Sequence, residues 1–174
     1  MEIVVGVVVL VALLAWYVTW TAGRIDRLHA RVDAARGVLD AQLVRRATAA
    51  IQLVAMAAAL LGPELAKRLG TAARGAVDAD AARREDAEND LSRVLREVPH
   101  LDADGYSDLV VAASRVGMAR HFYNDAVRDT RALRGRRVPR VFHLGGHRPL
   151  PSYFEIDDAG LAGPAPTDRN VPLP

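Results

Sequence analysis

The chain has 174 residues, which is room for one membrane anchor and one compact domain. It contains no cysteine, so disulfides, thiolate zinc sites and a cysteine nucleophile are excluded. A formal net charge of +2 is too small to indicate nucleic-acid binding. Only 5% of the residues are aromatic although 51% are hydrophobic, because Ala, Val and Leu predominate. Ala and Leu favour helices, so the composition indicates a helical protein.

An uncharged stretch, Ile3–Gly23, opens the chain. As a helix it is about 30 Å long at ~1.5 Å per residue, which matches the hydrocarbon core of a bilayer. A cleaved signal peptide is the alternative, but Glu2 stands where such peptides carry a basic residue, and the apolar run is too long. Aromatic residues, which favour the membrane interface, gather near the end of the stretch. They are Trp16, Tyr17 and Trp20. The sequence therefore predicts an uncleaved transmembrane anchor over residues 1–23.

Arginines flank this stretch on one side only. None precedes it, and four follow it closely: Arg24, Arg27, Arg31 and Arg36. Basic residues are enriched on the cytoplasmic side of membrane proteins. We therefore expect a single-pass protein of the cell (plasma) membrane, with its N-terminus outside and its C-terminal domain in the cytoplasm.

From residue 24 onward, apolar residues recur at intervals of three and four, which predicts amphipathic helices. The anchor helix is expected to continue to Gly62 and Pro63, because glycine stops a helix and proline suits the first turn of the next. Its apolar face is predicted to reach Leu60. A second helix is predicted from Pro63 to about Val77.

A third helix is predicted after Asp78 or Asp80, either of which can serve as its N-cap, and is expected to end near Val98. A loop over residues 100–105 follows. Ser107 is the predicted N-cap of a fourth helix that extends to about residue 133.

The fourth helix carries the clearest heptad pattern in the chain, typical of coiled-coil packing. Its seam residues are Leu109, Ala112, Val116, Ala119, Tyr123 and Ala126. Leu91 occupies the corresponding apolar face of the third helix. We therefore predict that Leu91 and Tyr123 lie in the core.

The predicted fold class is all-α. An N-terminal transmembrane helix continues into an antiparallel four-helix bundle, and an irregular Pro/Gly-rich C-terminal tail follows. The predicted domains are the transmembrane anchor (1–23), the helical bundle (24–133) and a basic, then Pro/Gly-rich, mostly irregular tail (134–174). Disorder is expected beyond Glu155, because such a composition disfavours regular structure.

Four sequence blocks are similar to those of one bacterial family, in the same order. They are DAQLVRR (40–46), AENDLS (87–92), RVGMARHFYNDAV (115–127) and PSYFE (151–155). On these blocks the chain resembles the LemA family of membrane proteins over roughly residues 3–155. The chain departs from the family in lacking a proline after the double arginine, and Arg36 stands where tryptophan is frequent. The resemblance implies an integral membrane protein with a short N-terminus outside and a helical bundle inside, and it implies no reaction.

Charged residues on or beside the core-facing stripes have two interpretations. The first is a polar patch that binds a partner. The second, which we favour, is a structural network of interhelical ion pairs, because a half-buried charge must be paired. The predicted members are Asp40, Arg45, Arg46, Glu88, Arg115 and Arg120.

A basic stretch follows the fourth helix. Its arginines are predicted to contact the membrane surface, since guanidinium groups are attracted to anionic headgroups. They are Arg134, Arg136, Arg137 and Arg140. A solvated helix end with ordinary surface arginines is the alternative, and both interpretations remain open.

The sequence predicts no enzyme, because no nucleophile motif or phosphate-binding glycine loop is present. No cofactor or metal site is predicted; His143 and His147 lie in a glycine-rich stretch that fixes no ligand geometry. The predicted function is a membrane-anchored cytoplasmic scaffold or adaptor of LemA type that organises a membrane-associated partner or the membrane itself. An accessory subunit of a membrane enzyme, such as a protease, is the alternative. The predicted partners are the lipid bilayer and another membrane or membrane-associated protein, with a homo-oligomer as a further option and no nucleic acid.

Overall fold

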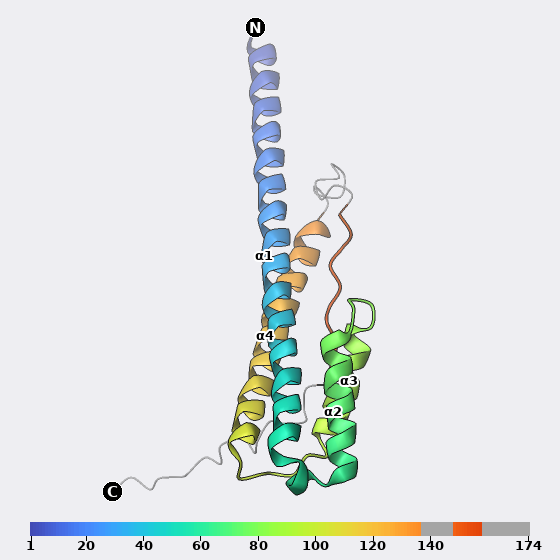
Figure 1. Ribbon diagram of the computed structural model, residues 1–174. Coiled ribbons are helices and arrows are strands. Elements are labelled where there is room, and N and C mark those ends of the chain that lie inside the picture. Colours follow the sequence, from blue (N-terminus) through green and yellow to red (C-terminus); the bar gives the residue numbers. More distant parts are fainter. Residues whose placement is uncertain (137–147, 158–174) are drawn as a thin grey trace, which may run out of the picture. The chain divides into compact units, whose positions relative to one another are not determined.

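Figure 1 shows a computed structural model of the chain, in which residues 1–136 and 148–157 are described. All regular structure in these residues is helical. The helices are α1 (Glu2–Leu61), α2 (Pro63–Asp78), α3 (Arg84–Leu95) and α4 (Asp104–Arg134). The predictions of an all-α protein, of four helices and of a long apolar N-terminal helix are confirmed for the described part of the chain.

The chain divides into two compact units. Of the described residues, the first unit comprises 1–37, 121–136 and 148–153, and the second comprises 38–120 and 154–157. Both α1 and α4 contribute one segment to each unit.

Helix α1 ends where the sequence predicts. Gly62 follows it with a φ of 76°, a left-handed conformation that favours glycine, and Pro63 begins α2. The expectation for Leu60 is wrong, because this residue is 64% exposed and Leu61 is buried instead. The backbone leaves helical geometry at Ala57, with φ −124° and ψ 23°, and this kink changes which side of the last turn faces the core.

The hydrophobic core of the second unit is built from leucine and alanine. Alanine lets helices approach closely, and leucine fills the space between them. Leu91 is fully buried in this core, which confirms its predicted position. Other members include Ala47, Ala50 and Leu53 of α1, Leu69 and Ala73 of α2, Leu95 of α3 and Leu109 of α4. Helices α2 and α3 pack against each other within this unit.

The chain breaks between α2 and α3, as predicted. The Asp80 carboxylate accepts hydrogen bonds from the backbone N–H groups of Ala82 (3.1 Å) and Arg83 (3.0 Å), which stabilise the turn before α3. The hydrogen bond from the Arg83 backbone N–H lowers the pKa of Asp80. Helix α3 begins at Arg84 with Arg83 as its N-cap, so the prediction of Asp78 or Asp80 as the N-cap is wrong, because the Asp80 carboxylate bonds within the preceding turn. The helix ends at Leu95, one turn earlier than expected.

Helix α4 begins at Asp104, so the prediction of Ser107 as its N-cap is wrong. A hydrogen bond from the Tyr106 N–H to the Ala103 carbonyl (3.0 Å) closes the first turn. The sequence interpretation placed Gly105 in a loop, but this glycine is buried against α1. A Cβ atom at this position would meet the Cε at the end of the flexible Met56 side chain and would lie at ordinary contact distance, 3.6 Å, from the Leu53 Cα, so Gly105 lies close against α1.

The first unit contains the N-terminal part of α1, the C-terminal part of α4 and residues 148–153. Ile25 and Val32 of α1 are buried, and so is Tyr123 of α4, which confirms its predicted burial. An exposed ion pair joins Arg31 to Asp129, with 3.5 Å between the guanidinium nitrogen and the carboxylate oxygen.

The tail is ordered further than the sequence predicts. In the second unit Phe154 and Ile156 are buried, and the backbone N–H of Asp157 donates to the Asn89 side chain (2.9 Å). The Asp157 carboxylate also pairs with Arg96, the residue that follows α3. The expectation of disorder beyond Glu155 is therefore wrong for residues 156 and 157, because apolar burial and these bonds hold them in place. The remainder of the tail, from residue 158, lies outside the described residues.

Candidate functional site

The apolar part of α1 is the most unusual surface of the described chain. This helix is long and apolar enough to cross a membrane, and no residue of its most apolar 18-residue stretch is buried. Near the end of the stretch Tyr17 lies beside Trp20, with 6.5 Å between the ring centroids. The Arg24 guanidinium lies over the Trp20 ring at 5.8 Å, so the apolar stretch ends in a cation–π contact.

A buried ion pair lies inside the second unit. The Arg46 guanidinium of α1 donates to the Glu88 carboxylate of α3 over 2.6 Å, and the two residues are 2% and 0% exposed. Arg46 also donates to the Ser92 hydroxyl (3.2 Å) and to the Glu88 backbone carbonyl (3.4 Å). The Arg46 Nε and the Glu88 Oε1 have no hydrogen-bond partner among the described residues. This pair links two helices but leaves part of its desolvation cost uncompensated.

Burial is the strongest influence on Glu88 and raises the pKa of its carboxyl group. The positive charge and hydrogen bond of Arg46 act in the opposite direction, and so does the charge of Arg84. The carboxylate of Asp40 adds to the rise. The Arg46–Glu88 pair therefore links α1 to α3, and the nearby charges of Arg84 and Asp40 act on Glu88 in opposite directions.

The other residues of the predicted network lie in different surroundings. Arg45 and Arg115 are exposed, and Asp40 and Arg120 are half-buried. Of the six predicted members, the structure joins Arg46 and Glu88 directly. The wider network remains a prediction.

The predicted membrane-contact arginines fall partly within the described residues. Arg134 is half-buried, and its guanidinium donates to the backbone carbonyls of Arg148 (2.8 Å) and Pro149 (3.2 Å). Arg136 is exposed. Arg137 and Arg140 lie outside the described residues. Arg134 thus binds the backbone of the protein's own chain.

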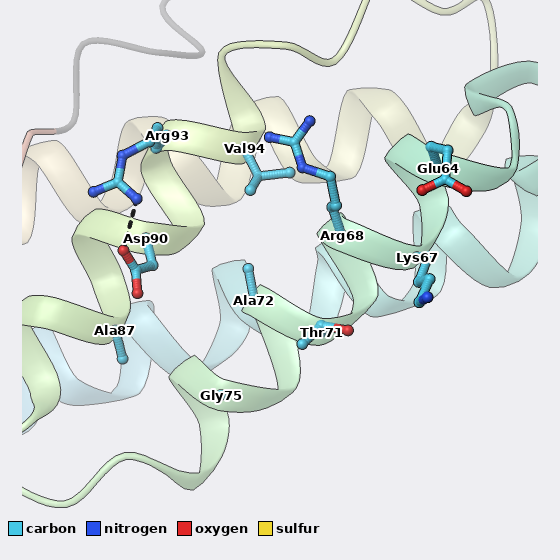
Figure 2. A pocket seen from close by; sticks show the side chains of 10 residues that line it. All are labelled: Glu64, Lys67, Arg68, Thr71, Ala72, Gly75, Ala87, Asp90, Arg93 and Val94. Atoms are coloured by element: carbon cyan, nitrogen blue, oxygen red, sulfur yellow. Dashed lines mark hydrogen bonds and ion pairs between the residues drawn. The ribbon is translucent and has the colours of Figure 1, made fainter.

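A groove runs between α2 and α3 and has a volume of about 620 Å³. Figure 2 shows small side chains, including Ala72 and Ala87, along it, with charged side chains at its edges. Arg93 pairs with Asp90 at 2.8 Å. Arg68 makes two bonds to Glu97, at 2.7 and 2.5 Å.

The four sequence blocks meet in pairs. Within the second unit, Arg46 of the first block binds Glu88 and Ser92 of the second. Within the first unit, the Tyr123 hydroxyl of the third block donates to the Ser152 carbonyl of the fourth over 2.8 Å. The sequence patterns did not predict the hydrogen bond of Arg46 to Ser92 or that of Tyr123 to the Ser152 carbonyl. The fourth block, 151–155, could have indicated that this part of the proline-rich tail is held in place.

No protein-family model, curated protein or solved structure matches the chain. The resemblance to the LemA family therefore stays a prediction that rests on the four blocks.

Proposed function

We propose that this protein is a membrane-anchored, non-catalytic helical scaffold or adaptor of LemA type, which organises a membrane-associated partner or the membrane itself. The observation that carries the proposal is the exposed apolar surface of α1. Soluble monomers rarely expose a contiguous apolar surface of this extent, because its contact with water is costly. In a bilayer the same surface is solvated by lipid tails, and the helix satisfies its own backbone hydrogen bonds.

The proposed orientation places the N-terminus outside and the rest of the chain in the cytoplasm at the plasma membrane. The four arginines from Arg24 to Arg36 support this orientation, because no basic residue precedes the apolar stretch.

Cysteine labelling tests the orientation, since the chain has no cysteine of its own. In intact cells we expect an impermeant maleimide to label Glu2→Cys and to spare Asp102→Cys, an exposed loop position. Asp102→Cys should react only after the cells are permeabilised. Labelling of Asp102→Cys alone in intact cells would show the opposite orientation. Release of the protein by alkaline extraction would show that α1 does not span the membrane.

We further propose that the helices form an antiparallel bundle. Gly62 alone separates α1 from α2, and short segments (79–83 and 96–103) join the later helices. Short connections favour antiparallel neighbours, because a parallel neighbour requires a connection that spans the length of a helix.

The LemA assignment is supported by the pairing of the four blocks. Residues of different blocks form hydrogen bonds with one another: Arg46 of the first block bonds to Ser92 of the second, and Tyr123 of the third bonds to the Ser152 carbonyl of the fourth. Each block therefore contacts another block.

Affinity purification of the full chain from native membranes, followed by mass spectrometry, tests the scaffold against the alternative of an enzyme subunit. The scaffold proposal expects a non-enzymatic membrane or membrane-associated protein, or lipid with further copies of the chain. Stoichiometric co-purification with a protease or another hydrolase would overturn it and favour the accessory subunit. A tagged unrelated single-pass protein controls for proteins that enrich nonspecifically.

A further inference from the structure

The 148–152 segment is fixed by side chains of α4. Arg134 holds the carbonyls of Arg148 and Pro149, Arg131 holds the carbonyl of Pro151 (3.0 Å), and Tyr123 holds that of Ser152. The Arg131 guanidinium also lies over the Tyr153 ring, 5.5 Å from its centroid. Bonds to four of its five carbonyls place this segment at a defined position, although it has no regular secondary structure.

A cavity of about 460 Å³ lies between this segment and α1, entirely within the first unit. Its apolar lining includes Val32 of α1, the Tyr123 side chain and Leu150. This volume lies within the range of small-molecule sites, roughly 300–1,000 Å³. An apolar wall with a few polar groups at its edge is the usual composition of such a site.

The charged groups of this cavity favour an anion. Arg36 and Arg148 line it, both are exposed, and neither guanidinium has an ion-pair partner among the described residues. Among the described residues that line it, Asp33 is the only one with a carboxylate. Two guanidinium groups against one carboxylate leave a net positive charge, and guanidinium groups bind phosphate and carboxylate through paired hydrogen bonds.

His29 supplies a second, independent indication of a ligand. This residue is buried, with 7% of its surface exposed, and it belongs to the cavity lining. The Nδ1 lies 3.0 Å from the Ile25 carbonyl oxygen, which can only accept, so Nδ1 carries the hydrogen. The Nε2 is buried without a partner among the described residues. It can accept a hydrogen bond from a ligand hydroxyl in the neutral ring, or donate one to an anion when protonated.

We propose that this cavity binds a phosphate ester, with Arg36 and Arg148 on the phosphate oxygens and the ester's alcohol part along Val32 and Leu150. Two sources share this chemistry: a phospholipid headgroup and a soluble phosphate ester. His29 lies six residues beyond Gly23, which is about 9 Å along the helix axis. The headgroup layer is about 5–8 Å thick, so in the proposed anchored state His29 lies just beyond this layer. The lipid source rests on the proposed membrane anchoring; the soluble source does not.

The test uses the full chain, purified in a maltoside detergent that contains no phosphate. Native mass spectrometry measures binding of three probes: short-chain phosphatidylglycerol, glycerol 3-phosphate, and a diacylglycerol that lacks phosphate. We expect saturable binding of a phosphate probe and none of the diacylglycerol. The double variant Arg36→Gln/Arg148→Gln should weaken binding at least about tenfold, because it removes the paired charge-assisted hydrogen bonds. The matched control is Arg45→Gln/Arg115→Gln, which changes the same charge at two exposed arginines of the second unit.

Each result supports or overturns the proposal. Binding of phosphatidylglycerol alone identifies the lipid source, and binding of glycerol 3-phosphate identifies the soluble source. Failure of both probes to bind the folded wild-type chain overturns the site, and so does an equal loss in the control variant. A chain that remains in the membrane under alkaline extraction yet binds neither probe would overturn this inference and leave the proposed membrane anchor intact.

Discussion

Replacing Glu88 with alanine is expected to lower the free energy of unfolding by about 3–5 kcal/mol. The reason is that Arg46, only 2% exposed, would keep its charge without a partner. Arginine cannot escape this cost by losing its proton, because its pKa is far above neutral. Denaturant unfolding of the full chain in detergent, followed by circular dichroism, measures the effect.

The reverse substitution, Arg46→Ala, should cost less. Glu88 can take up a proton when its partner is removed, since burial already raises the pKa of this carboxyl group. The double variant Arg46→Met/Glu88→Leu replaces both charges with apolar side chains of similar size, and we expect it to be close to the wild type in stability or above it. If Glu88→Ala unfolds at the same denaturant concentration as the wild type, the pair is not buried as described.

The same pair sets a pH dependence. A carboxyl group whose pKa is higher in the folded state than in the unfolded state binds its proton more tightly in the folded state. Its contribution to stability is therefore fully present below the ordinary value of 4.5 and is lost as the pH rises through the raised pKa. We expect this decline to be larger and to extend to higher pH in Arg46→Ala, because Arg46 opposes the rise in the Glu88 pKa, and to be absent from the double variant.

Leu91→Ala is expected to cost about 2–5 kcal/mol, because it removes a fully buried side chain and leaves a cavity between α3 and its neighbours in the second unit. The core around it is rich in alanine, and short side chains cannot extend to fill the space. The same denaturant unfolding experiment measures the loss.

Leu60→Ala is the matched control, since it makes the same chemical change at a leucine that is 64% exposed. We expect its effect to stay within about 0.5 kcal/mol. Equal destabilisation by the two substitutions would contradict the burial of Leu91 and the kink-dependent exposure of Leu60.

The helices could be predicted from the sequence because their signals are local. Gly62 and Pro63 mark the end of one helix and the start of the next, and the heptad seam gave the buried positions Val116 and Tyr123. The start of α4 could not be predicted in this way. Gly105 acts as a breaker in a sequence pattern, and only the structure shows that it lies inside α4, buried against α1.

The candidate sites depended on contacts between distant residues. The sequence placed Arg46 and Glu88 in a charged group but could not distinguish them from exposed members such as Arg45 and Arg115. The cavity beside His29 had no signal in the periodic pattern, because the 148–152 segment is neither helix nor strand.

The sequence by itself determined that α1 carries a long apolar stretch, that four helices follow one another and where their apolar faces lie. These properties depend on composition and on intervals of three and four residues, which are written into adjacent positions. Only the tertiary structure decided which charges are buried together and where the 148–152 segment lies. Both outcomes depend on hydrogen bonds between residues far apart in the chain, such as Arg46 with Glu88 and Arg134 with the carbonyl of Arg148, and no local pattern specifies which partner a side chain will meet.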